Sequence, residues 1–357
     1  MKTPMYLIAF LLLVVVSCND NVVDPKVNES DDTTTYYPNC KNFVPTDIYF
    51  PESIDLYSIS YNGINASILS TNYTYFDNLN LTTGIVTRIE FDKAKFLNIK
   101  NISMYSNRKF CPYNSNLVVF SAKVQKDTIG DGKNYTVTDE IVLHDINSNE
   151  IKLITPKSFG NITSGILSIE WVGTSKQDSN VFFISRSSTN RSFFHLETET
   201  LVSDNSIIGK YSKNFEYKVH TISRNNKSFY LNDKMISLQD TINYLNIVNI
   251  DFSFDNRYVM FTVIPQVTEG FVLQDSNARG RELWIIEVEK LRTSSGVFTD
   301  ITKINTRYRH CLFIYDKTAL LTPMNTIIAS MHSHDNLKGN VYEMDLKGNI
   351  LRKITNN

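Results

Sequence analysis

The chain has 357 residues and a formal net charge of -1, and this near-neutral balance excludes the strongly basic surface of a nucleic-acid-binding protein. Its 19 Tyr and 21 Phe residues, together with many Ile, Val and Thr residues, suit the pleated, half-buried surface of a β-sheet. No long segment combines Ala, Leu, Glu and Lys, which argues against a helical domain. The composition therefore predicts a nearly all-β protein, and the length allows one large propeller or two sandwiches.

The N-terminal residues have the pattern of a secretory signal. Lys2 supplies a positive charge, and residues 5–16 form an apolar run of roughly a dozen residues, shorter than the roughly 20 that span a bilayer. The run ends in Val-Val-Ser-Cys18, which resembles a bacterial lipobox. This resemblance implies that residues 1–17 are a removed signal peptide and that an acylated Cys18 anchors the mature protein to the membrane. A plain secretory signal that ends near a cysteine by chance is the alternative.

Residues 18–46 have the composition of a flexible polar tether, because Asn, Asp, Ser, Thr and Pro dominate and there is little apolar periodicity. With Cys18 set aside, Cys40, Cys111 and Cys311 remain, and an odd number leaves at least one thiol unpaired. An envelope compartment permits a disulfide, but the spacing selects no pair. The triplet that begins at Asp127 resembles the O-glycosylation triplet of Bacteroidetes, as do two similar triplets elsewhere.

From residue 47 onward the chain repeats a strand-turn-strand pattern. The clearest copy covers residues 251–262 and 282–288, and another covers residues 321–330 and 339–346. Weaker copies begin near residues 66, 111, 169 and 220. A period of about 50 residues favours a solenoid or a propeller over other folds.

The spacing of the copies gives about six units, and a count of seven also fits. We therefore predict one all-β propeller over residues 47–357, with about six four-stranded blades. Residues 258–263 are apolar on both faces of the predicted strand, as blades packed face to face require. We expect residues 46–50 or 56–59 to close the ring as a strand supplied from the other end of the chain.

Two stretches carry a family resemblance. The sequence Phe252-Ser-Phe-Asp-Asn-Arg-Tyr-Val-Met-Phe-Thr262 with Glu282-Leu-Trp-Ile-Ile286, and the stretch from Asn340 to Thr355, are similar to the repeat of TolB-like β-propellers. The resemblance implies a bacterial envelope protein with a propeller fold. Residues 19–46 leave no room for the separate N-terminal domain of TolB itself. The Gly-x-Ser-x-Gly nucleophile turn of peptidases fused to related propellers is missing from the sequence, so the resemblance implies a fold and no reaction.

One cluster has the residue types of a metal site. His332, His334 and Asp335 lie close together in sequence, and two His at this spacing with a nearby carboxylate can chelate a divalent metal. The same stretch falls where the repeat has a polar turn between its second and third strands, and such a turn is polar without any metal. We therefore keep these residues as candidate metal ligands and otherwise predict no catalytic residue and no cofactor. Trp284 lies in an apolar strand, where core packing is the expected role.

The predicted function is binding. We expect an outer-membrane lipoprotein whose propeller is a non-catalytic binding or scaffold module for a protein or a glycan, with specificity in the loops at 123–139 and 263–281. The alternative is a carbohydrate-active lyase or hydrolase built on the propeller, with a metal if the histidine cluster holds one. An enzyme requires carboxylates and histidines that converge with perturbed pKa values. The sequence selects neither the partner, the membrane leaflet nor the oligomeric state.

Overall fold

The computed structural model describes residues 56–68, 75–90, 99–104, 108–127, 135–154, 168–172, 181–185, 191–196, 198, 200–203, 209–214, 216–221, 228–238, 244–265, 282–304, 312–333 and 340–355. Strands joined by turns make up most of these segments, and α2 (Val288–Thr293) is a short helix among them. This confirms the all-β class. In the same segments, no helix has the length and apolar character needed to cross a membrane. The predicted signal peptide, the tether and Cys18 lie outside the described residues.

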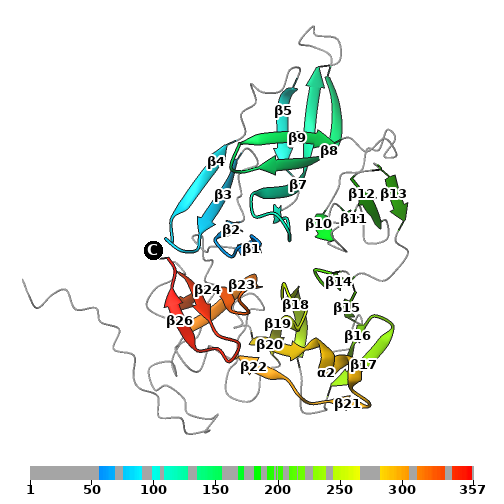
Figure 1. Cartoon of the computed structure of the whole chain (residues 1–357), viewed down its shortest axis with the longest axis vertical. Helices are drawn as coiled ribbons and strands as arrows, with labels where there is room; N and C mark the ends of the chain where they lie inside the picture. Colours follow the sequence, from blue (N-terminus) through cyan, green and yellow to red (C-terminus); the bar gives the residue numbers. More distant parts are fainter. Residues whose placement is uncertain are drawn as a thin grey trace, which may run out of the picture. The chain divides into compact units, whose positions relative to one another are not determined.

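The described strands form six sheets, which we name A to F in chain order. Each sheet comes mainly from one stretch of chain and therefore has neighbouring colours in Figure 1. Sheet A contains β1 (Leu56–Ile59), β2 (Asn65–Ile68), β3 (Tyr75–Asn80) and β4 (Val86–Glu90). Sheet B contains β5 (Ile99–Met104), β6 (Lys109–Phe110), β7 (Leu117–Asp127), β8 (Tyr135–Asp145) and β9 (Glu150–Ile154). Sheet C contains β10 (Ser168–Val172), β11 (Val181–Ser185), β12 (Arg191–His195) and β13 (Thr200–Ser203).

The second half of the chain forms sheets D, E and F. Sheet D contains β14 (Lys210–Tyr211), β15 (Lys218–Thr221), β16 (Ser228–Leu231) and β17 (Lys234–Leu238). Sheet E contains β18 (Tyr244–Phe252), β19 (Tyr258–Pro265), β20 (Glu282–Glu287) and β22 (Thr302–Ile304). Sheet F contains β23 (Leu312–Leu321), β24 (Ile327–Ser333), β25 (Asn340–Met344) and β26 (Ile350–Lys353). The segment between β20 and β22 supplies α2 and β21 (Val297–Phe298), and β21 adds to sheet D by parallel pairing with β17.

Alternating side chains of sheet E are buried on opposite faces. In β19, Phe261 belongs to a core shared with sheet D, whereas the adjacent Met260 belongs to a core shared with sheet F. In β20, Trp284 and Leu283 divide in the same way. Successive residues of a strand point to opposite faces, so sheet E is covered on both sides. This confirms the two-sided burial predicted for residues 258–263 and the core position predicted for Trp284.

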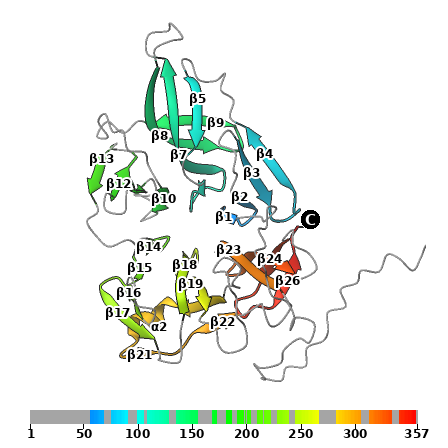
Figure 2. The same cartoon turned by 180° about the vertical axis from the view of Figure 1, so that it is seen from behind.

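The same kind of contact joins the last sheet to the first. Ile328 and Val341 of sheet F share a core with Leu56, Ala66 and other apolar residues of sheet A. The strands β1 and β23 lie in contact, and in Figures 1 and 2 the C-terminal strand β26 ends beside the hairpin of β3 and β4. Sheets A and F are therefore packed against each other although they are the most distant in sequence.

Contacts between the remaining neighbours complete a cyclic order. Ser67 of sheet A donates a hydrogen bond of 2.9 Å to the carbonyl of Arg108, just before β6 of sheet B, and Ile89 of β4 packs on the core of sheet B. The strands β7 and β10 join sheet B to sheet C. An edge-to-face pair of Phe193 and Tyr211 joins sheet C to sheet D, with ring centroids 5.8 Å apart. Each described sheet thus contacts the next, and the last contacts the first, which is the contact order of a β-propeller.

The innermost strands of three sheets end in the same hydrogen-bonded turn. A serine hydroxyl at the end of the strand donates to an Asn or Asp side chain two residues later, in the pairs Ser60–Asn62, Ser212–Asn214 and Ser253–Asp255. The same hydroxyl accepts the backbone N–H that starts the following strand. Asn256 has a φ of 59°, in the left-handed region that Asn tolerates in tight turns. These local bonds fix where each inner strand stops.

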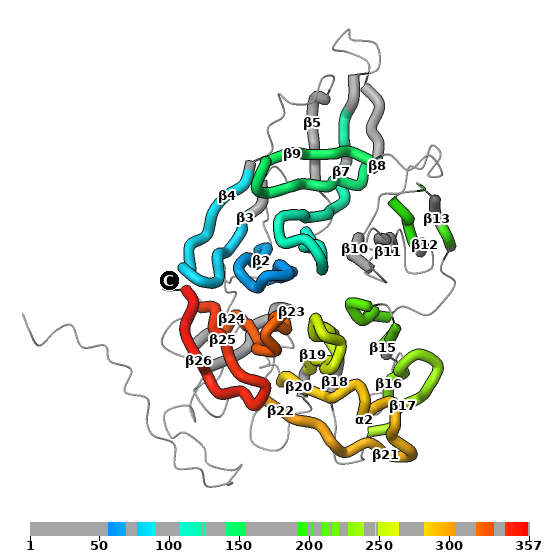
Figure 3. Tube along the Cα trace, viewed as in Figure 1, coloured from blue at the N-terminus to red at the C-terminus, as the bar shows by residue number. Residues whose placement is uncertain are grey.

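The structure corrects two sequence-based predictions. Residues 46–50, one of the two segments predicted to close the ring, lie outside the described residues, and the other segment, residues 56–59, does not close the ring as a strand borrowed from the other end of the chain. They form β1, which pairs with β2 in the same sheet, because a tight turn joins the two. The stretch 123–139 is also not a long loop, because Lys123 pairs with Asp139 and Asp127 with Tyr135 in the hairpin of β7 and β8. In Figure 3, coloured tubes trace the short strand β9 and the part of β8 that pairs with it.

Closure of sheet F onto sheet A depends on a glycine. Gly84 lies in the hairpin of β3 and β4 with a φ of +71°, and a Cβ atom there would lie 2.1 Å from the backbone oxygen of Ile354. Gly296 also has a positive φ of +87°, but no atom lies within 4 Å of its hypothetical Cβ. Both glycines therefore have a left-handed backbone conformation, and only Gly84 also lies against the backbone of another sheet.

We predict that Gly84→Ala destabilises the protein more than Gly296→Ala. Both variants bear the left-handed strain of about 1–2 kcal/mol, and only Gly84→Ala must also displace the backbone of the last sheet. Urea unfolding of the two variants measures the difference in the free energy of unfolding. Equal losses in the two variants would show that the contact between Gly84 and Ile354 does not contribute to stability.

Candidate functional site

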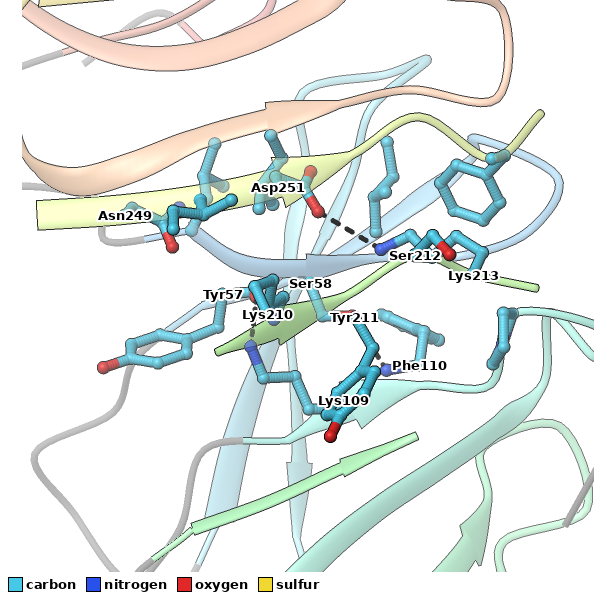
Figure 4. Close-up of a pocket in the computed structure, with 16 residues that line it drawn as sticks. Tyr57, Ser58, Lys109, Phe110, Lys210, Tyr211, Ser212, Lys213, Asn249 and Asp251 are labelled. Carbon is cyan, nitrogen blue, oxygen red and sulfur yellow. Dashed lines mark hydrogen bonds and ion pairs between the residues drawn. The ribbon is translucent and has the colours of Figure 1, made fainter. Parts of the chain in front are cut away.

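A cavity of about 220 Å³ lies where the inner strands of five sheets end. Its lining comes from β1, β6, β14, β18 and β23 and from the residues just after them. Figure 4 shows these strand ends side by side, with polar side chains of several sheets directed into the same space. The cavity is therefore built by segments that are far apart in sequence.

The lining residues occupy equivalent places in the repeat. The turns after the inner strands begin at Ser60, Cys111, Ser212, Ser253 and Thr322. The residue two positions before each of these faces the cavity, and the five residues are Ser58, Lys109, Lys210, Asp251 and Leu320. Side chains alternate along a strand. The residue two positions before each turn therefore lies on the same side of its sheet in every copy of the repeat. The repeat thus places this equivalent position of five sheets at the cavity, together with neighbouring residues of the same strand ends.

The described lining residues include charges of both signs. Among them, Lys109, Lys210 and Lys213 have ammonium groups and Asp251 has a carboxylate. Lys109 and Lys210 also interact with other groups of the protein.

Asp251 is held by neighbours on both sides. One carboxylate oxygen accepts a 3.2 Å bond from the Lys213 ammonium of sheet D, and the other accepts a 2.9 Å bond from the backbone N–H of Leu321 in sheet F. The residue is 5% exposed. Both oxygens are thus engaged in joining sheets D, E and F, which makes Asp251 a structural carboxylate and a poor general base.

Lys109 and Ser58 connect sheets A and B at the cavity wall. The Lys109 ammonium donates to the carbonyl oxygen of Tyr57 at 3.1 Å and lies 5.4 Å from the centre of the Tyr57 ring. The Ser58 hydroxyl oxygen accepts the backbone N–H of Phe110 at 2.9 Å. An accepting hydroxyl keeps its own hydrogen for donation, so Ser58 can offer a donor beside a fixed positive charge.

The turns that follow the inner strands are bonded to one another. Asn62 donates its N–H to Ser115 across sheets A and B, and Asn214 donates to the side chain of Asn256 across sheets D and E. Asn325 donates to Asp255 across sheets F and E at 2.8 Å. Tyr113 reaches from sheet B to the carbonyl of Lys213 in sheet D at 3.0 Å. These bonds fix the strand ends that line the cavity.

The structure describes one residue of the candidate metal cluster. His332 lies in β24, opposite Phe313 of β23, and not in the polar turn that the repeat predicted. His334 and Asp335 lie outside the described residues. Within the described segments, no group of three or more His, Cys, Asp or Glu side chains is placed to hold a metal ion.

The sequence did not single out the cavity lysines. A lysine before a turn is common in solvated loops, and no motif links Lys109 to Lys210. The turns nevertheless contain a usable signal. When the repeats are aligned on Ser60, Ser212 and Ser253, the cavity residues Ser58, Lys210 and Asp251 fall at the same position. The predicted specificity loop at 263–281 is outside the described residues from residue 266 to 281, and β19 continues to Pro265.

Comparisons with known proteins assign neither a family nor a function to this chain. No protein-family model and no curated protein sequence matches the chain. Hydrazine synthase of Kuenenia stuttgartiensis is 9% identical, with 88% of this chain and 90% of that chain covered and a TM-score of 0.44. The β-propeller domain of Cps50 (Swd1) from Myceliophteria thermophila is 10% identical, with coverage of 81% and 83% and a TM-score of 0.43. A chain of the COPII outer coat vertex on membranes is 10% identical, with coverage of 82% and 84% and a TM-score of 0.42.

We predict that Asp255→Ala lowers the free energy of unfolding by about 1 kcal/mol at pH 7. Burial raises the pKa of Asp255, but hydrogen bonds from Ser253, Asn325 and Arg257 outweigh burial and lower the pKa below its ordinary value of 3.8. A lowered pKa means that this stabilisation is present above pH 3.8 and is lost as the pH falls through the folded-state pKa. Urea unfolding from pH 7 to pH 3 measures both effects.

Asp233→Ala is the matched control, because Asp233 is an exposed aspartate of the β16–β17 hairpin. Its unfolding free energy should follow that of the wild type at every pH. If Asp255→Ala also follows the wild type, the bonded turns do not stabilise the fold.

Proposed function

We propose that this protein is a bacterial envelope lipoprotein whose six-bladed β-propeller binds a ligand without transforming it. The cyclic contacts among sheets A to F support the propeller, with one sheet per blade. The observation that carries the function is the cavity, whose described lining comes from five of the six sheets. A site assembled from so many blades is suited to recognise a ligand from several directions at once.

Binding is favoured over catalysis by the state of Asp251, the one carboxylate among the described cavity residues. Hydrolysis or elimination on a sugar needs an acid and a base that can exchange protons with the substrate. Asp251 is committed to Lys213 and to the Leu321 N–H, and the remaining charged lining residues are lysines. The lining therefore offers charge and hydrogen-bond donors, which are the components of recognition.

The binding proposal predicts a ligand that the protein binds and releases without chemical change. A panel of soluble neutral and charged glycans, followed by thermal unfolding and mass spectrometry, should give saturable stabilisation with no change in glycan mass. Co-purification of one stoichiometric protein partner would support the scaffold form of the same proposal. Turnover of a glycan that is lost in Asp251→Asn would refute the proposal and indicate an enzyme.

The membrane anchor is the second part of the proposal and rests on the sequence alone. An acylated Cys18 would bury many methylene groups in the bilayer, and residues 18–46 would lift the propeller away from the membrane. From the lipoprotein signal we also propose that the protein is located in the outer membrane.

We predict that cells fed an alkyne analogue of palmitate label the wild-type protein and do not label Cys18→Ser, because the thiol of Cys18 starts the acylation. Cys40→Ser is the control and should keep the label. Label on Cys18→Ser, or no label on the wild type, would contradict the anchor.

A further inference from the structure

We propose that His220 is an acid-sensitive element of the fold, whose protonation loosens the inner strands of sheet D and with them one wall of the cavity. His220 lies in β15, and the neighbouring strand β14 contributes Lys210 and Tyr211 to the cavity lining. The inference concerns the stability of sheet D and goes beyond the proposed binding function. It holds whether or not the cavity binds a ligand.

His220 is buried without hydrogen bonds. The residue is 7% exposed, and among the described residues it has two buried ring nitrogens that lack a hydrogen-bond partner. Buried polar groups in proteins are normally hydrogen-bonded, and an imidazole ring always has at least one N–H donor. The neutral ring therefore already lowers the stability of the sheet, and a phenyl ring of similar shape would avoid this loss.

Stacking holds the ring of His220 in place. It lies against the ring of Tyr230 on the neighbouring strand β16, with ring centroids 4.6 Å apart and an angle of 11° between the ring planes. The two residues are directly opposite each other in the pairing of β15 with β16. Cross-strand ring pairs stabilise a sheet. This contact requires only a flat ring, so it does not explain why the ring is one that can take up a proton.

Protonation of His220 brings a second N–H donor and a positive charge into the same place. Burial disfavours the charged form, the positive charge of Lys218 on the same strand adds to this effect, and Asp233 in the β16–β17 turn opposes it, which leaves the pKa below the ordinary value of 6.5. The face of the Tyr230 ring attracts a cation. The N–H groups of an imidazolium lie in the plane of its ring, however, so stacking on Tyr230 leaves both donors without a partner.

His220 lies on the face of sheet D that meets sheet C. Val219, its neighbour in β15, belongs to the core shared with sheet E, so His220 points to the opposite face. Tyr211 of β14 is paired with Lys218, two residues before His220 and therefore on the same face. There Tyr211 contacts Phe193 of sheet C, with ring centroids 5.8 Å apart. A charge on His220 thus acts close to the contact between sheets C and D.

The strand β14 depends on β15 for its place in the sheet. It has two residues and lies at the end of the strand order of sheet D, where it pairs with β15 through Lys210–Val219 and Tyr211–Lys218. Residues 210–213 line the cavity, and Figure 4 shows them along one of its sides. Loosening β15 therefore releases the part of the cavity wall that sheet D supplies.

The direction of the pH effect follows from linkage between protonation and opening. Because the pKa of His220 is lowered in the folded sheet, the opened sheet takes up the proton more readily. The stability that neutral His220 allows is complete above pH 6.5 and is lost as the pH falls through the folded-state pKa. A folded-state pKa that is lower by one makes opening about tenfold easier once the pH is below both values.

The test is hydrogen exchange of the full chain in detergent at pH 7.5 and pH 5, read by mass spectrometry and corrected for the intrinsic pH dependence of exchange. In the wild type, peptides covering residues 209–221 should lose protection about tenfold at pH 5. His220→Phe keeps a ring against Tyr230 and takes up no proton, so its protection should be the same at both pH values. His220→Gln is a second uncharged variant with the same expected result, and circular dichroism at pH 7.5 checks that both are folded.

His195→Phe is the matched control, because it removes a half-buried histidine from β12 of sheet C. Residues 209–221 of this variant should lose protection at pH 5 as they do in the wild type. Peptides covering residues 340–353 of sheet F are the internal reference, and their protection should change equally in the wild type and in both His220 variants.

Three results would overturn the inference: equal protection of residues 209–221 at both pH values in the wild type, a loss in both His220 variants as large as in the wild type, or a wild-type loss that is equal in sheets D and F. The first result needs no variant. None of the three bears on ligand binding, so the proposed function would remain. Conversely, a cavity that binds neither a glycan nor a protein leaves the acid-sensitive element in place.

Discussion

A sheet with apolar side chains on both faces must be covered twice, and this requirement organises the molecule. Phe261 and Met260 are neighbours in β19, yet they are buried in cores shared with different sheets. In an open stack of such sheets, one face of the first sheet and one face of the last would remain in water. The core shared by Leu56 of sheet A and Ile328 of sheet F covers both of those faces. Burial of apolar surface is the dominant favourable term in folding, so it favours the contact between the two ends of the chain.

The cavity follows from the same arrangement. Each sheet begins with an inner strand, and the turn at its end stops the strand at a defined residue, as Ser253 does with Asp255. In five of the described sheets these strand ends lie together, and the residue two positions before each turn lines a common space. Apolar contact between sheets thus supplies the framework, and the polar residues at the strand ends supply the chemistry. Asp251 connects the two roles, because it binds Lys213 at the cavity and the N–H of Leu321 in the next sheet.

Local signals predicted the fold class and the elements of its clearest repeats. The apolar strands at 258–263 and 282–288 and the core role of Trp284 could be read from residue pattern because burial on both faces leaves a continuous apolar run. The role of residues 56–59 could not, because nothing in that short segment shows whether its partner is the next strand or a distant one. The hairpin arm at 123–127 was missed because most residues between 123 and 139 are polar or Gly, as in a loop, although Lys123 lies between the buried Ala122 and Val124 in the alternation of a strand. The sequence pattern does not identify the cavity lysines, since they come together only when the sheets pack against one another.

Hydrogen exchange in Ile354→Ala tests the closed ring most directly. Ile354 is 7% exposed and lies in the core shared by sheets A and F, so truncation removes packing from both, with an expected cost of about 2–5 kcal/mol. Exchange followed by mass spectrometry should become faster in peptides covering residues 56–81 as well as in those covering residues 340–355. Faster exchange confined to the last sheet would contradict the account, because sheet A would then not depend on the end of the chain.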